Sequence, residues 1–408
     1  MPSNYRNFRH SVPWLILLLE AVFIIGCYFV SSNNEIIISD VSHADFQDVN
    51  HMVIFGFGFF LTFLRRYGFS STGFNLLIIA LGIQCSVVTE ILLPSSDEGV
   101  DEDVLRRISK AAMSMTAVVI STGAVLGKAN PVQLILMTIV EIILFHISRR
   151  INSEFLMVQD GEGMMHVLLF GAYFGLALSS RFSEPSPRSE KKASTPKSHL
   201  LAMLGTLFLW VFWPSFNSVL VVEDKNKAVY NTYFALATSA VIAFALSALT
   251  TKDGKLRMAH IHSAVLAGGV AVSYVVDIID YPWIAMILGL LASVIAVLGS
   301  YCLERCWNPV LKIHDSAGVH FTFGLPGVLG ALAQVVIFII KTWNDGPGLG
   351  YFIMLRIGAF CVTISFALIT GFITGLILNS KLFKTIPVSK YFDDLFYWEV
   401  SFHVKLTV

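Results

Sequence analysis

The sequence predicts an all-α, polytopic membrane protein with about twelve transmembrane helices. Three observations lead to this fold class: the composition, a series of apolar segments, and an uneven distribution of Lys and Arg. The chain is 55% hydrophobic and only 14% charged, whereas soluble domains carry about 25% charged residues. Its mean hydropathy is +0.71. The lipid bilayer is therefore expected to be the main surroundings of this protein.

Twelve apolar segments approach the length of a membrane span, which needs about 20 residues to cross roughly 30 Å of hydrocarbon. The first is not expected to be a signal peptide, because it is too long and no small-residue cleavage site follows it. The predicted spans are 13–30, 49–64, 73–93, 110–127, 131–148, 162–180, 199–218, 229–249, 259–276, 282–302, 321–341 and 349–379.

The charged loops predict that both termini lie in the cytoplasm. A cytoplasmic N-terminus places most of the 28 Lys and Arg residues inside, and the acidic run around Asp101 outside; cytoplasmic loops carry such a positive excess. The segment 183–198 is rich in Ser, Pro and Lys and is expected to be a flexible cytoplasmic linker. We predict one membrane domain over 1–408, with half 1 at about 13–182, half 2 at about 199–380 and a cytoplasmic tail at 381–408.

A weak internal repeat relates the two halves. The shift that aligns Asp160 with Asp315 also aligns Gly175 with Gly330. In each copy the acid lies near the start of a predicted span, the sixth or the eleventh, and the glycine lies within it; an odd number of spans between two copies inverts one relative to the other. The glycines are expected to allow close helix packing. For the two acids, a capping role and a functional role both remain open.

Several classes of function are not expected. The net charge of zero gives no reason to expect a nucleic-acid partner, and the chain has neither Gly-x-Ser-x-Gly nor His-Glu-x-x-His. We therefore expect no enzyme and no cofactor. His166 and His320 are interpreted first as packed or interfacial groups, and the pair Trp210 and Trp213 as part of an interfacial aromatic belt.

Motifs along almost the whole chain resemble the Rh branch of the ammonium transporter superfamily. They include Phe46-Gln47-Asp48-Val49, Tyr67-Gly68-Phe69-Ser70-Ser71, Gly123-Ala124-Val125-Leu126-Gly127-Lys128, Phe170-Gly171-Ala172-Tyr173, Trp213-Pro214-Ser215-Phe216-Asn217-Ser218, Gly324-Leu325-Pro326-Gly327 and Tyr391-Phe392-Asp393-Asp394. The resemblance implies an ammonium-transporter-like inverted-repeat fold, assembled as a trimer whose protomers each have a narrow apolar pore. It also implies recruitment and deprotonation of ammonium, followed by passage of ammonia along two pore histidines.

The motifs place Leu168 and Phe323 at the positions of those two histidines. His166, two residues before Leu168, should face elsewhere because two residues turn a helix by about 200°. His320 keeps an upstream histidine of the family. The motifs also place Phe216 and Met113 at the positions of two gating phenylalanines. Asp160 and Asp315 match two family acids, thought to aid recruitment or to hold the vestibules.

Within the family, a chain without the pore histidines is most similar to the blood group Rh(D/CE)-type polypeptides. This resemblance implies a supporting role in the plasma membrane. The implied partners are the Rh-associated glycoprotein, in a homo- or hetero-trimer of the red-cell membrane, and ankyrin of the membrane skeleton. The alternative is a working channel for a neutral gas, ammonia or carbon dioxide, which needs no proton relay. We expect a dry, plugged lumen between Phe323 and Leu168, and therefore poor ammonium transport.

Overall fold

A computed structural model describes residues 6–31, 41–93, 104–183, 193–221, 224–251, 253–306, 314–343, 349–380, 383 and 385–399. Its regular elements within these ranges are all helical, which confirms the predicted class. In order they are α1 (Arg6–Ser31), α2 (His43–Asn50), η1 (His51–Gly56), α3 (Phe57–Phe60), α4 (Gly68–Leu92), α5 (Val104–Ala124), α6 (Pro131–Leu156), α7 (Asp160–Met165), α8 (Val167–Ser179), α9 (Pro196–Ser218), α10 (Lys225–Thr250), α11 (Met258–Val272), α12 (Pro282–Cys306), η3 (His320–Gly324), α14 (Leu325–Thr342), α15 (Leu349–Leu378), η4 (Val388–Lys390) and η5 (Asp394–Phe396).

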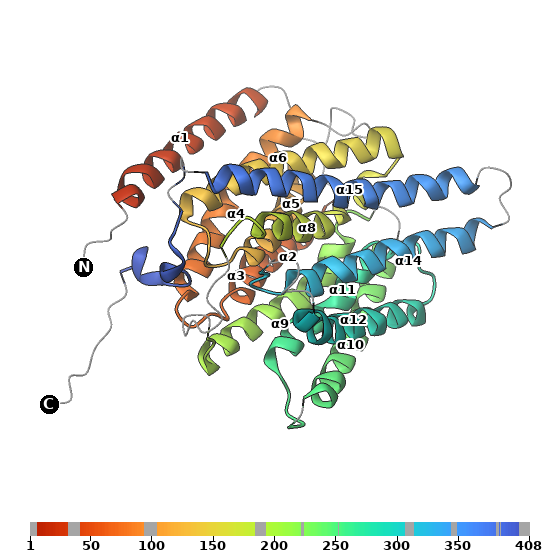
Figure 1. Cartoon of the computed structure of the whole chain (residues 1–408). Helices are drawn as coiled ribbons and strands as arrows, with labels where there is room; N and C mark the ends of the chain where they lie inside the picture. Colours follow the sequence, from red (N-terminus) through yellow and green to blue (C-terminus); the bar gives the residue numbers. More distant parts are fainter. Residues whose placement is uncertain are drawn as a thin grey trace.

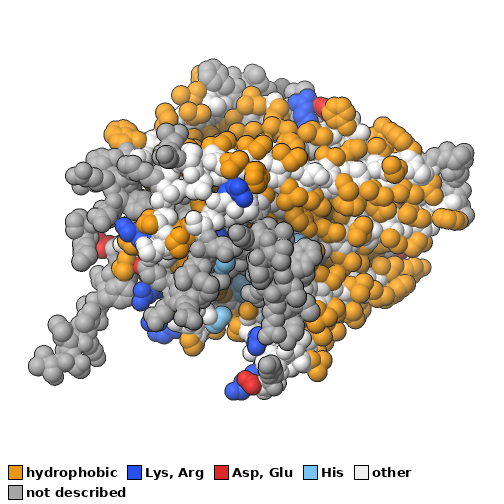
Figure 2. Space-filling model, in the orientation of Figure 1, with side chains coloured by type: hydrophobic (Ala, Val, Ile, Leu, Met, Phe, Trp, Pro, Cys, Tyr) orange, Lys and Arg blue, Asp and Glu red, His pale blue; other side chains and the backbone are white. Residues whose placement is uncertain are grey.

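The helices form one bundle, with the described part of the C-terminal tail at one end (Figure 1). Nine helical segments within the described ranges are long and apolar enough to cross a membrane. The three other predicted spans are helical as well. The span at 49–64 is interrupted by η1, the span at 110–127 lies on α5 with its basic first turns, and the span at 259–276 lies on the short α11. Figure 2 shows a broad hydrophobic surface on the side of α14 and α15.

Local sequence signals set the start of two long helices. Asn130 and Gln133 form a reciprocal capping box before α6, with Pro131 at the first helical position. Thr195 and Ser198 form a second capping box before α9. Such caps pair backbone and side-chain groups that a helix end leaves without partners.

Small residues allow α15 to pack directly on α8. The buried face of α15 repeats every four residues at Ala359, Thr363, Ala367, Gly371 and Gly375. A Cβ atom at Gly371 would lie only 2.5 Å from the carbonyl oxygen of a residue in α8. Larger side chains would push the helices apart, as is typical of helix contacts in membranes.

The predicted repeat has a counterpart in the packing. A Cβ at Gly175 of α8 would lie 2.6 Å from the Cα of Ser121 in α5. At the aligned Gly330 of α14, it would lie 2.3 Å from the carbonyl oxygen of Ala271 in α11. The aligned glycines therefore each meet the backbone of a helix, and those two helices correspond to the fourth and ninth predicted spans.

Residues 385–399 of the predicted tail dock on the bundle at what we call the tail end. The Asp394 carboxylate accepts hydrogen bonds from the backbone N–H of Phe69 (2.9 Å) and of Ser70 (2.8 Å), in the first turn of α4. Phe392 donates its N–H to the carbonyl of Gly127 at 3.1 Å. The tail thus ties the start of α4 to the connection between α5 and α6. Residues 184–192 of the predicted linker, and residues 381, 382, 384 and 400–408 of the predicted tail, lie outside the described residues.

Replacing Asp394 should weaken tail docking. Asp394→Ala leaves two backbone N–H groups at the start of α4 without their acceptor, so we expect a loss of about 1 kcal/mol in stability. Asp394→Asn keeps one acceptor oxygen and should lose less. The measurement is thermal unfolding of the purified protein, with limited proteolysis of the tail. Glu399→Ala, an exposed acid on the same tail, is the matched control.

Limited proteolysis of the tail should also depend on pH. Burial raises the pKa of the Asp394 carboxyl above its ordinary value, and the nearby Asp393 adds to the rise. A raised pKa in the docked state favours docking at low pH, and this contribution is lost as the pH rises through the raised pKa. Proteolysis of the wild-type tail should therefore be slower at a pH near the ordinary carboxyl pKa of 3.8 than at neutral pH, and faster cleavage at the lower pH would contradict this assignment.

Candidate functional site

Phe323 lies in a buried aromatic cluster where two interrupted helices meet. Its side chain is 1% exposed. The ring centroids of Phe57, Phe60 and Trp213 lie 5.9, 6.1 and 6.4 Å from that of Phe323. Phe323 belongs to η3, and Phe57 and Phe60 follow η1. Both η segments are single π-helical turns, which often occur at functional positions.

Trp213 extends the cluster toward α9 and corrects one interpretation. The sequence placed Trp213 in an interfacial belt, and this is wrong, because the side chain is 0% exposed and its ring stacks on Phe323 with an interplanar angle of 15°. Its ring also lies 6.1 Å from that of Phe216, which is buried too. Trp210, one turn earlier, is half-buried against Tyr233.

His262 closes the cluster on the other side of Phe60. The two rings stack at 3.9 Å with an interplanar angle of 13°, and Nε2 of His262 lies 3.0 Å from the carbonyl oxygen of Phe60. The sequence did not predict that Phe57, Phe60 or His262 would belong to this cluster. Helical periodicity could have placed these side chains on a buried face, but not against Phe323.

Helix α8 fills the space on the side of Leu168, which is 0% exposed. It packs closely against the junction of η3 and α14. A Cβ at Gly324 would lie 3.6 Å from Cβ of Ala172, and a Cβ at Gly327 would lie 3.0 Å from Cδ2 of Leu169. Met113 of α5 is also 0% exposed. Four of the predicted site residues are therefore almost completely buried, with almost no adjoining space large enough for a water molecule. They are Leu168, Met113, Phe216 and Phe323.

His166 belongs to a separate polar network among α6, α15 and the α7–α8 junction. Its Nδ1 lies 2.9 Å from Oγ1 of Thr363, and Nδ2 of Asn152 lies 2.8 Å from the same oxygen. The ring of Tyr274 lies 5.7 Å away. This network holds a histidine that the motif comparison expected to point away from the Leu168 position.

The predicted Asp315 and His320 form a second polar group. The Asp315 carboxylate accepts the backbone N–H of His320 at 2.9 Å and thereby caps η3. The His320 ring meets the ring of Tyr173 edge-on at 5.9 Å. Nearby, the ammonium of Lys128 donates to the carbonyl of His314 at 2.7 Å. Asp160 is the first residue of α7, and its side chain lies outside the described residues.

A buried ion network, which the sequence did not predict, joins α4 to α6. The guanidinium of Arg149 pairs with both carboxylate oxygens of Glu90, and Nδ1 of His146 lies 3.0 Å from one of them. Nε2 of His146 lies 2.9 Å from Oγ of Ser86. Removing one member would leave a buried charge, so this network has a structural role.

The chemistry open to the aromatic cluster follows from its lining. An ammonium ion that entered it would lose its hydration shell and find mainly apolar atoms, which is costly. Within the described part of the chain, no group of three or more His, Cys, Asp or Glu residues could hold a metal ion. The cluster therefore suits a closed barrier better than a proton relay.

Truncating Phe323 should create a cavity. Phe323→Ala removes a buried ring, and such changes cost about 3–5 kcal/mol. Phe244→Ala removes a phenyl ring that is 42% exposed on α10 and should cost much less. Thermal unfolding of both variants in detergent measures the difference, and equal losses would contradict the packing described for Phe323.

Known proteins resemble this chain over nearly its whole length. Residues 14–394 match the model of the Ammonium Transporter Family. An RH-like protein of Macaca mulatta is 39% identical over 409 residues, covering 98% of each chain. The blood group Rh(CE) polypeptide of Homo sapiens is 39% identical over 412 residues, again covering 98% of each chain.

Solved structures agree with these relatives. Nitrosomonas europaea Rh50, a member of the Rhesus protein family of channels, superposes with a TM-score of 0.77 and 28% identity, over 87% of this chain and 91% of that one. A Sensor Amt Protein has the same fold, with a TM-score of 0.71 and 19% identity, over 85% of this chain and 94% of that one. This chain therefore belongs to the ammonium transporter family, within its Rh group.

Proposed function

We propose that this chain is a supporting subunit of an Rh complex and that its own protomer conducts ammonium poorly. The observation that carries this proposal is the position of Phe323, 1% exposed within a cluster of aromatic rings. The motif comparison puts Phe323 and Leu168 where the family has its pore histidines. Neither replacement can accept or pass on a proton.

The remaining predicted positions keep the scaffold of a channel. We propose that Phe216 and Met113 occupy the sites of the two gating phenylalanines, and that Asp160 and Asp315 lie at the two vestibules. His320 donates its backbone N–H to the Asp315 carboxylate. It would be a family histidine that this chain keeps at the tail end. These residues would shape the protomer without completing a proton relay, since neither Leu168 nor Phe323 carries the imidazole that titrates near physiological pH.

The proposed setting is the plasma membrane, with both termini in the cytoplasm. The Lys and Arg distribution supports this orientation. The tail, which docks on the bundle through Phe392 and Asp394, would then offer a cytoplasmic surface for ankyrin of the membrane skeleton. The proposed assembly is a trimer, either of this chain alone or with the Rh-associated glycoprotein.

Transport should be absent when this chain is expressed alone. In a cell that lacks its own ammonium transporters, we expect no pH-dependent ammonium flux above an empty vector, because the central barrier is apolar. Proteoliposomes should likewise gain no ammonia or carbon dioxide permeability over empty vesicles. The double variant Leu168→His with Phe323→His tests whether these two residues cause the lack of flux. If they do, flux should appear in this variant before it appears in the single variants.

The controls for this assay are a conducting Rh protein and the single variants. Surface labelling must show similar amounts of each protein at the membrane. Strong pH-dependent flux through the wild-type chain would show that the proposal is wrong.

The supporting role predicts dependence on a partner. The chain should co-purify with the Rh-associated glycoprotein from red-cell membranes, and its surface level should fall when that glycoprotein is depleted. Immunoprecipitation and surface biotinylation measure these outcomes. A stable surface level without the glycoprotein would contradict the proposed partnership, independently of the flux result.

A further inference from the structure

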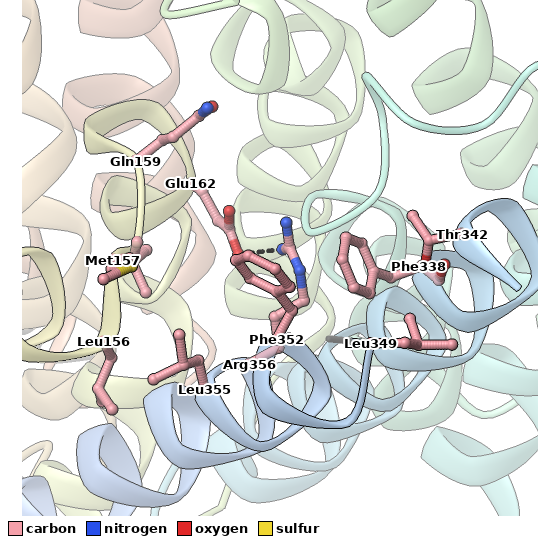
Figure 3. Close-up of a pocket in the computed structure, with 11 residues that line it drawn as sticks. Leu156, Met157, Gln159, Glu162, Phe338, Thr342, Leu349, Phe352, Leu355 and Arg356 are labelled. Carbon is pink, nitrogen blue, oxygen red and sulfur yellow. Dashed lines mark hydrogen bonds and ion pairs between the residues drawn. The ribbon is translucent and has the colours of Figure 1, made fainter. Parts of the chain in front are cut away.

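A cavity lies between the ends of four helices at the end of the bundle opposite the tail. The end of α6, the short α7, the last turns of α14 and the first turns of α15 enclose it (Figure 3). Its volume is about 360 Å³. Most of its walls are apolar, with Leu156, Leu349, Phe352 and Leu355 among the lining residues.

One ion pair lies within these apolar walls. Nη1 of Arg356 donates to Oε1 of Glu162 at 2.8 Å, and Nε2 of Gln334 donates to the same oxygen at 2.6 Å. The guanidinium carbon also lies 4.4 Å from the centre of the Phe338 ring. Figure 3 shows the Glu162 and Arg356 side chains pointing toward each other across the cavity. The side chains are 18% and 28% exposed, so the pair is partly open to this space.

The ion pair has unused capacity for a ligand. A guanidinium has five N–H donors in a fixed planar arrangement. Within the described part of the chain, Arg356 donates a hydrogen bond from Nη1 alone, and the acceptor is Glu162. The remaining donors could hold two oxygens of a phosphate in the bidentate geometry that arginine favours. Glu162 balances the charge of Arg356, and Asp277 is a second acid close enough to act on Glu162, so a ligand that carries a cationic group as well as a phosphate matches the site best.

The depth of Arg356 matches the border between hydrocarbon and headgroups. Helix α15 has 30 residues and is therefore about 45 Å long, which exceeds the hydrocarbon thickness of about 30 Å. If the excess is shared between both ends, the border lies about 7 Å below the start of α15. Arg356 follows Leu349 by two helical turns, about 10 Å. Its guanidinium thus lies within reach of lipid phosphates.

An apolar cavity at this depth is expected to be filled. Water would find few polar partners along walls formed by leucine and phenylalanine side chains, and an empty space would forfeit dispersion contacts. Phospholipid is the most abundant amphipathic molecule around a membrane protein. Its phosphate matches Arg356, and its acyl chain matches the apolar side chains of Leu355 and Leu156.

We propose that this cavity is a binding site for a single zwitterionic phospholipid, with its phosphate on Arg356, its headgroup toward Phe352, and the start of an acyl chain along Leu355 and Leu156, which reaches Gly358 beyond Arg356. Glu162 orients the guanidinium and faces the cationic headgroup. The part of the lipid inside the cavity packs between α14 and α15 and so holds these helices to α6 and α7. No proton relay or conduction step depends on this site.

The other end of α15 provides a matched control. There the guanidinium of Arg181 lies 4.5 Å from the centre of the Phe372 ring. This arrangement repeats the arginine–phenylalanine contact of Arg356, but Arg181 is not among the residues that line the cavity. A lipid that bound only because of a membrane-facing arginine would bind equally at both ends.

The test is native mass spectrometry of the full-length protein, titrated with phosphatidylcholine after delipidation. We expect one tightly held lipid per chain for the wild type and for Arg181→Gln. Arg356→Gln should weaken this binding about tenfold or more, because a charge-assisted hydrogen bond is lost. Leu355→Trp, which fills the cavity and leaves the ion pair intact, should also weaken it. This second variant decides the outcome if Arg356→Gln fails to fold.

Further arms identify the ligand. Phosphatidylcholine with a photoreactive acyl chain should label the peptide that contains residues 349–356. Inorganic phosphate and soluble phosphocholine should not displace the bound lipid, whereas displacement by either would indicate a site for free phosphate groups. Equal binding by Arg356→Gln and the wild type, or binding of a sterol but not phosphatidylcholine, would overturn the proposal.

Discussion

The membrane imposes the constraint on which this structure depends: backbone N–H and C=O groups in hydrocarbon must be paired within the chain. Helices meet this requirement, and irregular backbone is tolerated only where protein surrounds it. Three residues of each π-helical turn, η1 and η3, are buried, so protein covers one face of each turn beside the cluster around Phe323. The two helix interruptions and the candidate site therefore occupy the same part of the bundle.

Close helix packing supports this arrangement. Glycines at the contacts of α8 with α15, and of α14 with α11, bring backbones together where a Cβ would collide. The same packing leaves little room around Leu168 and Met113, which are 0% exposed. Aromatic and aliphatic side chains fill the contact between these helices, and the proposed supporting role rests on this closed packing.

The polar groups lie around this apolar centre. The Glu90–Arg149–His146 network joins α4 to α6, His166 links α6 to α15 through Thr363, and Asp394 caps α4 from the tail. Each network joins elements that are far apart in sequence, and each satisfies groups that would otherwise be costly to bury. The Glu162–Arg356 pair differs from these networks because it borders a cavity.

The sequence by itself determined the helical class and the positions of nearly all helices, and it predicts that Leu168 and Phe323 stand at two positions where the family has histidines. These features are local, because hydropathy, helical periodicity and motif spacing are read along the chain. Only the tertiary structure placed Trp213 and His262 in the cluster of Phe323, paired Glu162 with Arg356, and docked Asp394 on α4. Such contacts depend on which faces of distant helices meet, and that choice follows from side-chain packing across the whole bundle.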